Sequence, residues 1–272
     1  MEISVILTGN PNVGKSTVFN RLTGLKQHTG NWSAKTVEKK EGILRDGGDT
    51  FRVVDLPGAY SLTAHSPEEE VTRDCLTNGL PDGAVVTIVC DGGALERNLM
   101  LCCEVLSITR RVVVCVNLMD EAARRGIFVD GAALAAELGC PVVLCAARSG
   151  DGIAQLIGAI RDMAKPDAAV SPVSDKGTRE VYAARARELA GKVVTYGEPT
   201  RWRACGGECT SCKKGRNCAV QRCGERMPHC ADRHPDRIDR GIDRVLTGRW
   251  TAFPCMVFFL FILFWLTLVG AS

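Results

Sequence analysis

The chain has 272 residues, of which 46% are hydrophobic and 24% charged, and its formal net charge is +3. This length suits one sizeable domain plus an accessory segment. The charge is too small to indicate binding to nucleic acid, so we expect no nucleic-acid partner.

Residues 1–165 alternate between short β-branched runs and helical stretches, which is typical of an α/β fold with parallel strands. The expected strands are residues 3–7, 51–54, 85–89, 112–116 and 142–145. The expected helices are residues 15–22, 68–77, 95–108, 134–138 and 153–163. Residues 37–44 are more polar and precede a Gly-Gly turn, so they are predicted to form an edge strand antiparallel to 51–54. The pattern predicts a mixed six-stranded sheet with helices on both faces.

A glycine-rich loop follows the first expected strand and reads G-x-x-x-x-G-K-S. Its glycines allow backbone N–H groups to surround phosphates at the positive end of the next helix. Lys15 is placed to reach the β- and γ-phosphates, and the Ser16 hydroxyl to ligate Mg²⁺. A chance glycine-rich turn is the alternative. The pattern predicts a nucleoside triphosphate site that contains Gly9, Asn10, Pro11, Asn12, Val13, Gly14, Lys15, Ser16 and Thr17.

Two further elements would complete the phosphate and Mg²⁺ site. Asp55 and Gly58 form a D-x-x-G element at the end of a strand, about forty residues after the glycine-rich loop. Asp55 is expected to hold Mg²⁺ through a water, and the Gly58 N–H to contact the γ-phosphate. Thr36 is the candidate switch threonine, which closes on Mg²⁺ when the γ-phosphate is present. We expect Lys15, Thr36 and Gly58 to be the residues that act on the reacting phosphate.

The base site is predicted from two segments that follow later strands. Asn117-Leu-Met-Asp120 places a carboxylate that can accept both N1–H and the 2-amino group of guanine, which adenine cannot offer. Leu118 stands where lysine is usual. We therefore expect its side chain to pack over the glycine-rich loop, while the contact that a lysine ammonium would make is lost. A helix N-cap is the alternative role for Asp120. Ala146 and Ala147 occupy the place where a backbone N–H contacts guanine O6.

The second part of the chain, residues 166–250, is predicted to be a linker and a short helical segment. Residues 166–177 are rich in Pro, Ser, Asp and Ala, residues 180–194 have a helical pattern, and residues 235–250 form an Arg-Asp amphipathic helix. Seven cysteines fall in expected core elements, where they act as small hydrophobes: Cys75, Cys90, Cys102, Cys103, Cys115, Cys140 and Cys145.

A cysteine-rich insert, residues 205–230, is of another kind. Cys209 and Cys212 have metal-knuckle spacing, and a cytoplasmic location disfavours disulfides. Zinc, iron or an iron–sulfur cluster is therefore predicted here, and a solvated loop with free thiols is the alternative. The candidate ligands are Cys205, Cys209, Cys212, Cys218, Cys223 and Cys230.

Residues 251–271 are apolar and carry no charge, and about 20 such residues match the thickness of a bilayer core. We expect a transmembrane helix here; a buried core helix is the alternative. Five arginines precede it, and this positive flank places the bulk of the chain in the cytoplasm. The helix is either a tail anchor or the first helix of a longer membrane protein.

These motifs resemble the ferrous iron transport protein B (FeoB) family. The resemblance rests on residues 9–20, 30–42, 55–62, 66–70 and 95–99, and on residues 239–250 before the apolar segment. It implies a Ras-like P-loop GTPase domain over residues 1–165, with GTP, GDP and Mg²⁺ as ligands. It also implies a membrane importer of Fe²⁺ that the nucleotide cycle gates, with a homo-oligomer and small accessory iron-transport proteins as partners.

The resemblance also implies how GTP is hydrolysed. Asn12 matches an asparagine that holds K⁺ against the phosphates in potassium-activated members, where the cation neutralises developing charge. Ala59 stands where Ras-type proteins carry a water-positioning glutamine, so we expect slow hydrolysis with the water held by backbone groups.

Two other readings stay open. One is a membrane-tethered regulatory GTPase with a Cys-rich metal or redox sensor and no transport activity, and the other is a ribosome- or tRNA-associated GTPase, against which the apolar segment argues.

Overall fold

The computed structural model describes residues 1–24, 27–31, 38–63, 66–166, 177–200 and 202, together with Phe261 and Trp265. For residues 27–31, 38 and 39 it describes the backbone alone. Apart from Phe261 and Trp265, all of these residues belong to one compact unit, Met1–Arg226. The account below concerns that unit.

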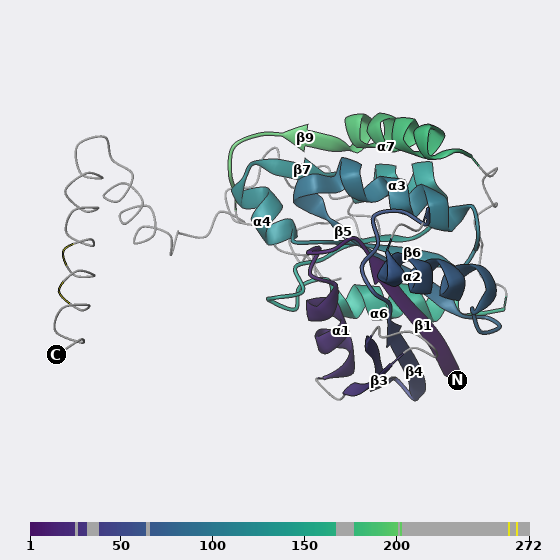
Figure 1. The fold of residues 1–272 in the computed structure, drawn as a ribbon. Helices are drawn as coiled ribbons and strands as arrows, with labels where there is room; N and C mark the ends of the chain where they lie inside the picture. The colour runs from purple at the N-terminus through teal and green to yellow at the C-terminus, as the bar shows by residue number, and fades with distance from the viewer. Residues whose placement is uncertain are drawn as a thin grey trace. The chain divides into compact units, whose positions relative to one another are not determined.

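The unit is built on a seven-stranded mixed sheet (Figure 1). The strand order is β2-β3-β4-β1-β5-β6-β8, and β3 alone runs against the other six. Val-rich sequences form the central strands because both faces of these strands are covered. The strands are β1 (Glu2–Gly9), β2 (Gln27–Asn31), β3 (Glu38–Asp46), β4 (Asp49–Asp55), β5 (Val85–Asp91), β6 (Val112–Asn117) and β8 (Val142–Leu144).

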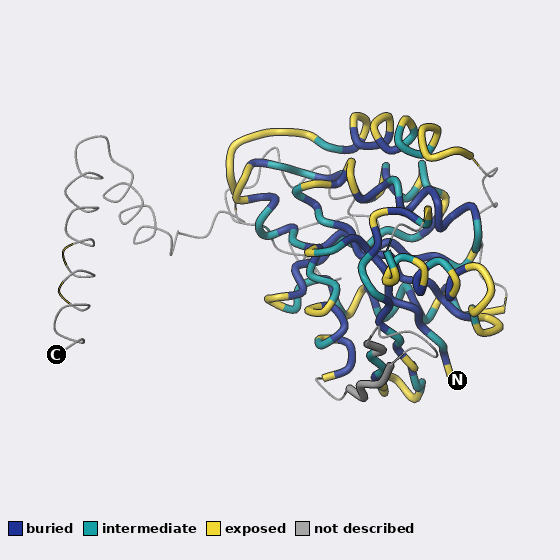
Figure 2. Tube along the Cα trace, in the orientation of Figure 1, coloured by how far each residue is buried: buried dark blue, intermediate teal, exposed yellow. Residues whose placement is uncertain are grey.

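Two apolar cores lie on opposite faces of the sheet. On one face, α1 (Lys15–Thr23) and α6 (Ile153–Met163) bury residues such as Phe19 and Leu156. On the other face lie α2 (Pro67–Asn78), α3 (Leu95–Leu106), α4 (Met119–Arg124) and α5 (Gly131–Leu138). Figure 2 shows the resulting pattern, in which the sheet is buried and exposed residues lie on the outer surfaces of the helices. The sequence of α3 has apolar residues at helical spacing, which explains why so much of this helix is buried.

The helix α7 (Arg179–Val193) packs along the outside of α3 (Figure 1). Its buried residues Ala186, Leu189, Ala190 and Val193 belong to the same core as α3. After α7 the chain forms β9 (Val194–Tyr196), which pairs antiparallel with β7 (Ile127–Val129) in a separate two-stranded sheet. Residues 179–196 are therefore held to the α/β unit by both a helix and a strand.

Most predicted elements are confirmed, but the strands β2, β7 and β9 and the helix α4 were not predicted. The expected strands and helices of residues 1–165 are present, with ends that differ by a few residues, and the helix predicted at 180–194 is α7. The prediction of six strands with 37–44 at the edge is wrong, because β2 pairs antiparallel outside β3. The sequence of β2, Gln-His-Thr-Gly-Asn, has no apolar alternation. Backbone hydrogen bonds to β3 define this strand, and side-chain patterning does not reveal it.

Several predictions fall on residues outside the described ranges. These are most of the 166–177 linker, the six candidate cysteine ligands in 205–230, the amphipathic helix 235–250 and nearly all of 251–271. Within the described ranges, no helix is long and apolar enough to cross a membrane. The described residues also contain no group of three or more His, Cys, Asp or Glu arranged to hold a metal ion. The seven cysteines predicted in the core are all buried, free thiols.

Candidate functional site

The predicted site residues meet at one edge of the sheet. The loops that carry them follow the carboxyl ends of β1, β4, β6 and β8, which all run in the same direction. In open α/β sheets this edge is where ligands bind. The fold therefore brings Lys15, Asp55, Asn117 and Ala147 to the same edge, although up to 132 positions separate them in the sequence.

The loop after β1 has a backbone that few residues adopt. Gly14 has φ +78°, and a Cβ at this position would lie 2.4 Å from Asn117 Nδ2. A Cβ on Gly9 would lie 2.4 Å from the carbonyl oxygen of Val89 on the next strand. Asn12 also has a positive φ, 66°, and its side chain is exposed. Asparagine tolerates this conformation better than most residues, so the loop geometry is consistent with its sequence.

The loop leads into the N-terminus of α1, which has no side-chain cap. The first N–H groups of this nine-residue helix therefore point out of its end, where they favour an anion. The Lys15 ammonium at this end contacts the Asp55 carboxylate, which is only 6% exposed. Burial raises the pKa of the Asp55 carboxyl above its usual value, and Lys15 opposes that rise. The cation predicted to bind phosphate and the carboxylate predicted to bind Mg²⁺ are thus in direct contact.

Asn117 joins the phosphate loop to the candidate base site. Its side-chain Nδ2 donates to the carbonyl of Val13 at 3.0 Å, and its Oδ1 accepts from the Ala147 N–H at 2.9 Å. Asn117 is 1% exposed, and both hydrogen bonds are buried. An amide carries both a donor and an acceptor, and here each has a partner. Asn117 therefore fixes two loops that are predicted to bind different parts of one nucleotide.

Leu118 and Asp120 follow at the start of α4. Leu118 adopts the left-handed conformation, with φ 59°, and its Cδ2 would lie 3.6 Å from a Cβ on Gly14. The apolar side chain thus lies over the phosphate loop, as the sequence predicted for a leucine in the place of lysine. The Asp120 carboxylate is partly exposed and lies 3.7 Å from Arg124 Nη2, one helical turn later. Asp120 is therefore accessible to a base.

The loop after β8 differs from the expectation in one respect. Ala146 N–H donates to the carbonyl of Asp151 at 3.0 Å, and Ala147 N–H donates to Asn117. Both N–H groups that were predicted to contact guanine O6 therefore have acceptors within the protein. A contact to O6 from either would require a shared or exchanged hydrogen bond.

The remaining predicted residues lie near the phosphate loop or outside the described ranges. Ser16 and Thr17 are exposed at the start of α1. Gly58 lies in the segment after β4, where the next residue, Ala59, donates its N–H to the Gly9 carbonyl at 3.1 Å. This bond joins the predicted γ-phosphate contact to the phosphate loop. Thr36 lies outside the described residues.

Arg21 has a role that the sequence analysis missed. From the last turn of α1, its Nε donates to the Ala147 carbonyl at 2.9 Å, and its Nη2 donates to the Arg148 carbonyl. These partners lie 126 and 127 positions away, so no local pattern points to them. Arg21 therefore connects α1 to the loop after β8, which carries Ala147.

Replacement of Arg21 by alanine is expected to loosen that loop and speed release of GDP. The two lost hydrogen bonds contribute about 0.5–1.5 kcal/mol each, and about 1–3 kcal/mol together predicts a roughly 5- to 150-fold faster dissociation rate. The rate is measured by displacement of a fluorescent GDP analogue in a stopped-flow instrument. Arg52→Ala is the matched control, because Arg52 is also exposed but pairs with Glu2. An R21A rate equal to that of the control would show that Arg21 does not stabilise the bound state.

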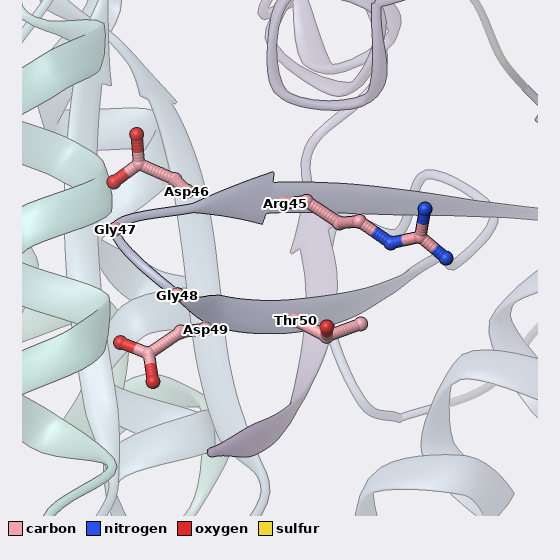
Figure 3. A pocket seen from close by; sticks show the side chains of 6 residues that line it. All are labelled: Arg45, Asp46, Gly47, Gly48, Asp49 and Thr50. Atoms are coloured by element: carbon pink, nitrogen blue, oxygen red, sulfur yellow. The ribbon is translucent and has the colours of Figure 1, made fainter.

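A cavity of about 210 Å³ lies elsewhere, at the turn between β3 and β4 (Figure 3). Because β4 begins there and ends at Asp55, this turn is at the opposite end of the strand from the candidate site. Asp46 and Asp49 line the cavity, and Arg161 binds both. The terminal amino group of Met1 binds Asp49 at 2.9 Å, and these two cations hold the pKa of that carboxyl below its usual value. The carboxylates are neutralised within the protein, so this cavity is not the candidate site.

Comparison with known proteins agrees with the geometry of the site. Residues 3–160 match the family model for ferrous iron transport protein B. The chain belongs to this family. A fusion of Fe²⁺ transport protein A with Fe²⁺ transporter FeoB from Porphyromonas gingivalis (strain ATCC BAA-308 / W83) is 42% identical over 154 residues. The Fe²⁺ transporter FeoB of Staphylococcus aureus (strain MSSA476) is 40% identical over 163 residues.

The match to these FeoB relatives covers only part of each. It covers 57% and 60% of this chain but 18% and 24% of the two relatives, so the chain spans about a fifth to a quarter of their length. Among solved structures, the cytosolic domain of the T. maritima FeoB iron transporter in a GDP form is similar, with a TM-score of 0.67 and 26% identity. That match covers 72% of this chain and all of the other. The Ras-like α/β GTPase fold of the FeoB family is thereby confirmed.

Proposed function

We propose that this chain binds and hydrolyses GTP as the cytoplasmic domain of a ferrous iron importer. The observation that carries the proposal is the Asn117 bridge, which fixes the phosphate loop at Val13 and the base loop at Ala147 together. A site built this way fits one ligand that has both phosphates and a base. The names of the FeoB relatives supply the transported ion, Fe²⁺, and the GDP form of the T. maritima domain supplies the nucleotide class.

The described residues also fit a magnesium ion. Ser16 offers an exposed hydroxyl and Asp55 a carboxylate, and hard oxygen ligands of this kind suit Mg²⁺. Thr36 is proposed as a third ligand. When bound, Mg²⁺ neutralises charge on the β- and γ-phosphates. In the structure Lys15 and Asp55 pair with each other, so nucleotide binding would transfer Lys15 to the phosphates and free Asp55 for the metal ion.

Hydrolysis is proposed to depend on the backbone of the segment after β4. Ala59 is fully buried and has no side-chain group that could orient a water molecule. The N–H of Gly58 makes no hydrogen bond within the described part of the chain, so it is available to the γ-phosphate. Without a glutamine or an arginine at this place, we expect slow hydrolysis.

Asn12 is proposed to hold a potassium ion beside the phosphates, because its exposed amide lies in the phosphate loop with a positive φ. A monovalent cation there supplies positive charge to the developing transition state. We expect hydrolysis by the full chain to be ~10-fold faster in KCl than in NaCl, since an added cation contributes on the order of 1 kcal/mol or more. Asn12→Ala is expected to abolish the difference while GTP still binds.

Phosphate release from GTP, measured for the wild-type chain and for Asn12→Ala in both KCl and NaCl, tests these proposals together. Equal rates in KCl and NaCl would remove the role of Asn12 and leave the GTPase proposal standing. Failure of the wild-type chain to release phosphate from GTP in either salt would contradict the GTPase proposal itself.

The membrane location is also a proposal. The FeoB relatives are named transporters, and the apolar residues 251–271 are proposed to cross the cell (inner) membrane with the GTPase domain in the cytoplasm. The fusion of transport protein A with FeoB in P. gingivalis supports a small accessory protein as a partner.

A further inference from the structure

Glu104 is a buried carboxylate on α3 that binds the segment after Asp55 with both of its oxygens. Ser61 Oγ donates to Oε1 at 2.7 Å, and the Leu62 N–H donates to Oε2 at 2.6 Å. Glu104 is 5% exposed and Ser61 is 3% exposed. No ion pair to Glu104 is present within the described ranges. The two hydrogen bonds from this segment are therefore the main compensation for burying the charge.

The residue types at this contact specify one conformation. The Ser61 oxygen accepts from the Thr63 N–H at 3.0 Å, so its hydroxyl proton is left to point at Glu104. The Leu62 N–H can only donate, and a carboxylate can accept from both donors at once. A neutral amide would offer one acceptor oxygen in place of two. Hydrogen bonds to a charged acceptor are also stronger than neutral ones, which favours this arrangement over alternatives.

The same helix holds the neighbouring residue, Tyr60, from a second point. The guanidinium of Arg97 lies over the Tyr60 ring, with 4.5 Å between Cζ and the ring centroid. The carbonyl of Arg97 accepts from the Asn10 side-chain amide at 3.4 Å, which connects this turn of α3 to the phosphate loop. Thus α3 contacts three consecutive residues, 60–62, and the phosphate loop itself.

The path of Gly58 and Ala59 is set by what lies on either side of them. On one side, the Leu56 N–H donates to the Leu7 carbonyl of β1 at 2.9 Å. On the other side, Ser61 and Leu62 are fixed by Glu104. Four residues separate these two points, and among them the Ala59 N–H donates to the Gly9 carbonyl at 3.1 Å, so the backbone of this segment is held at three places.

We propose that Glu104 is a positioning residue for GTP hydrolysis, which sets the backbone of Gly58 and Ala59 opposite the γ-phosphate by holding Ser61 and Leu62. The inference rests on the proposed GTPase function. Because Ala59 cannot orient water through its side chain, the rate depends on where these backbone groups lie. A displacement of about 1 Å at a catalytic group can cost roughly 100-fold in rate. Loss of the Glu104 contacts therefore lowers the rate of the chemical step more than it weakens GTP binding.

The test compares variants of the full chain, purified in detergent, for kcat and KM with GTP. Glu104→Ala is expected to lower kcat by ~10- to 100-fold and to change KM by less than about threefold. Glu104→Gln keeps one acceptor for Leu62 and is expected to recover part of the loss. Ser61→Ala combined with Glu104→Ala is expected to lower kcat no further than Glu104→Ala alone, because both changes remove one shared contact. Hydrogen exchange at the Leu62 amide reports directly whether Glu104 holds it.

Glu96→Ala is the matched control, since Glu96 is also a glutamate on α3 but is exposed and pairs with Arg187. A Glu104→Ala chain with wild-type kcat, or with a change in KM alone, would overturn the inference. If that variant does not fold, Glu104→Gln and Ser61→Ala decide the question by the same kcat criterion. An inactive wild type overturns the proposed GTPase function and this inference with it. An active wild type with unaffected variants overturns this inference alone.

Discussion

Replacement of Lys15 by alanine is expected to lower the affinity of the chain for GTP by at least ~30-fold. Truncating one member of a hydrogen-bonded, poorly solvated charge pair costs about 2–5 kcal/mol, and 2 kcal/mol corresponds to roughly 30-fold. The Lys15 side chain is only 12% exposed, and this lysine is the first residue of α1 and pairs with Asp55. Its removal takes away the charge that the phosphates would meet and leaves Asp55 buried without this partner.

The affinity is measured by calorimetric titration with GTP and Mg²⁺ at several pH values. Burial already raises the pKa of Asp55, and Lys15 opposes the rise, so without Lys15 the carboxyl takes up a proton at a higher pH than before. The loss of affinity is therefore expected to grow as the pH falls. Lys165→Ala is the control, because Lys165 is an exposed lysine that pairs with Asp162. A Lys15→Ala chain that binds GTP within threefold of this control would contradict the assignment.

Replacement of Asp120 by asparagine is expected to shift the preference of the chain from GTP to xanthosine triphosphate. The carboxylate of Asp120 can accept from N1–H and from the 2-amino group of guanine. An asparagine amide instead offers one acceptor and one donor, which match the N1–H and the 2-oxo group of xanthine. A hydrogen bond to a charged group contributes about 1.5–3 kcal/mol, so GTP binding is expected to weaken roughly 10- to 150-fold.

Competition between the two nucleotides for a fluorescent analogue measures this shift. Asp130→Asn is the matched control: Asp130 caps α5 through its Oδ1, and asparagine is an equally good N-cap. The control is expected to keep the wild-type preference for GTP. An Asp120→Asn chain that still prefers GTP to xanthosine triphosphate would exclude the carboxylate from base recognition.

The sequence was sufficient for the parts of the site that depend on local pattern. Gly9, Gly14 and Lys15 occur together in one loop because a phosphate needs that backbone, and the strand and helix on either side are readable from apolar periodicity. The same holds for Asp55, which is the last residue of β4. The place of Leu118 over the phosphate loop also agrees with the prediction, although its left-handed backbone was not foreseen.

The contacts that connect these loops were not predictable, since they join residues far apart in the chain. Asn117 meets Val13 across 104 positions, and Arg21 meets Ala147 across 126. Glu104 gave one signal that was overlooked, namely an acidic residue in the otherwise apolar second half of α3. A charge at such a position is rarely buried without a partner, so it indicates a polar contact even when the partner is unknown.

Phosphate release from GTP and from ATP, compared for the full chain with Mg²⁺ and KCl, is the most direct test of the central claim. The Asn117 bridge and the Asp120 carboxylate predict phosphate release from GTP. ATP is expected to be hydrolysed at least ~10-fold more slowly, because adenine has neither the N1–H nor the 2-amino group that would donate to the Asp120 carboxylate. Equal hydrolysis of the two nucleotides, or binding of neither, would contradict the assignment of this edge of the sheet as a guanine nucleotide site.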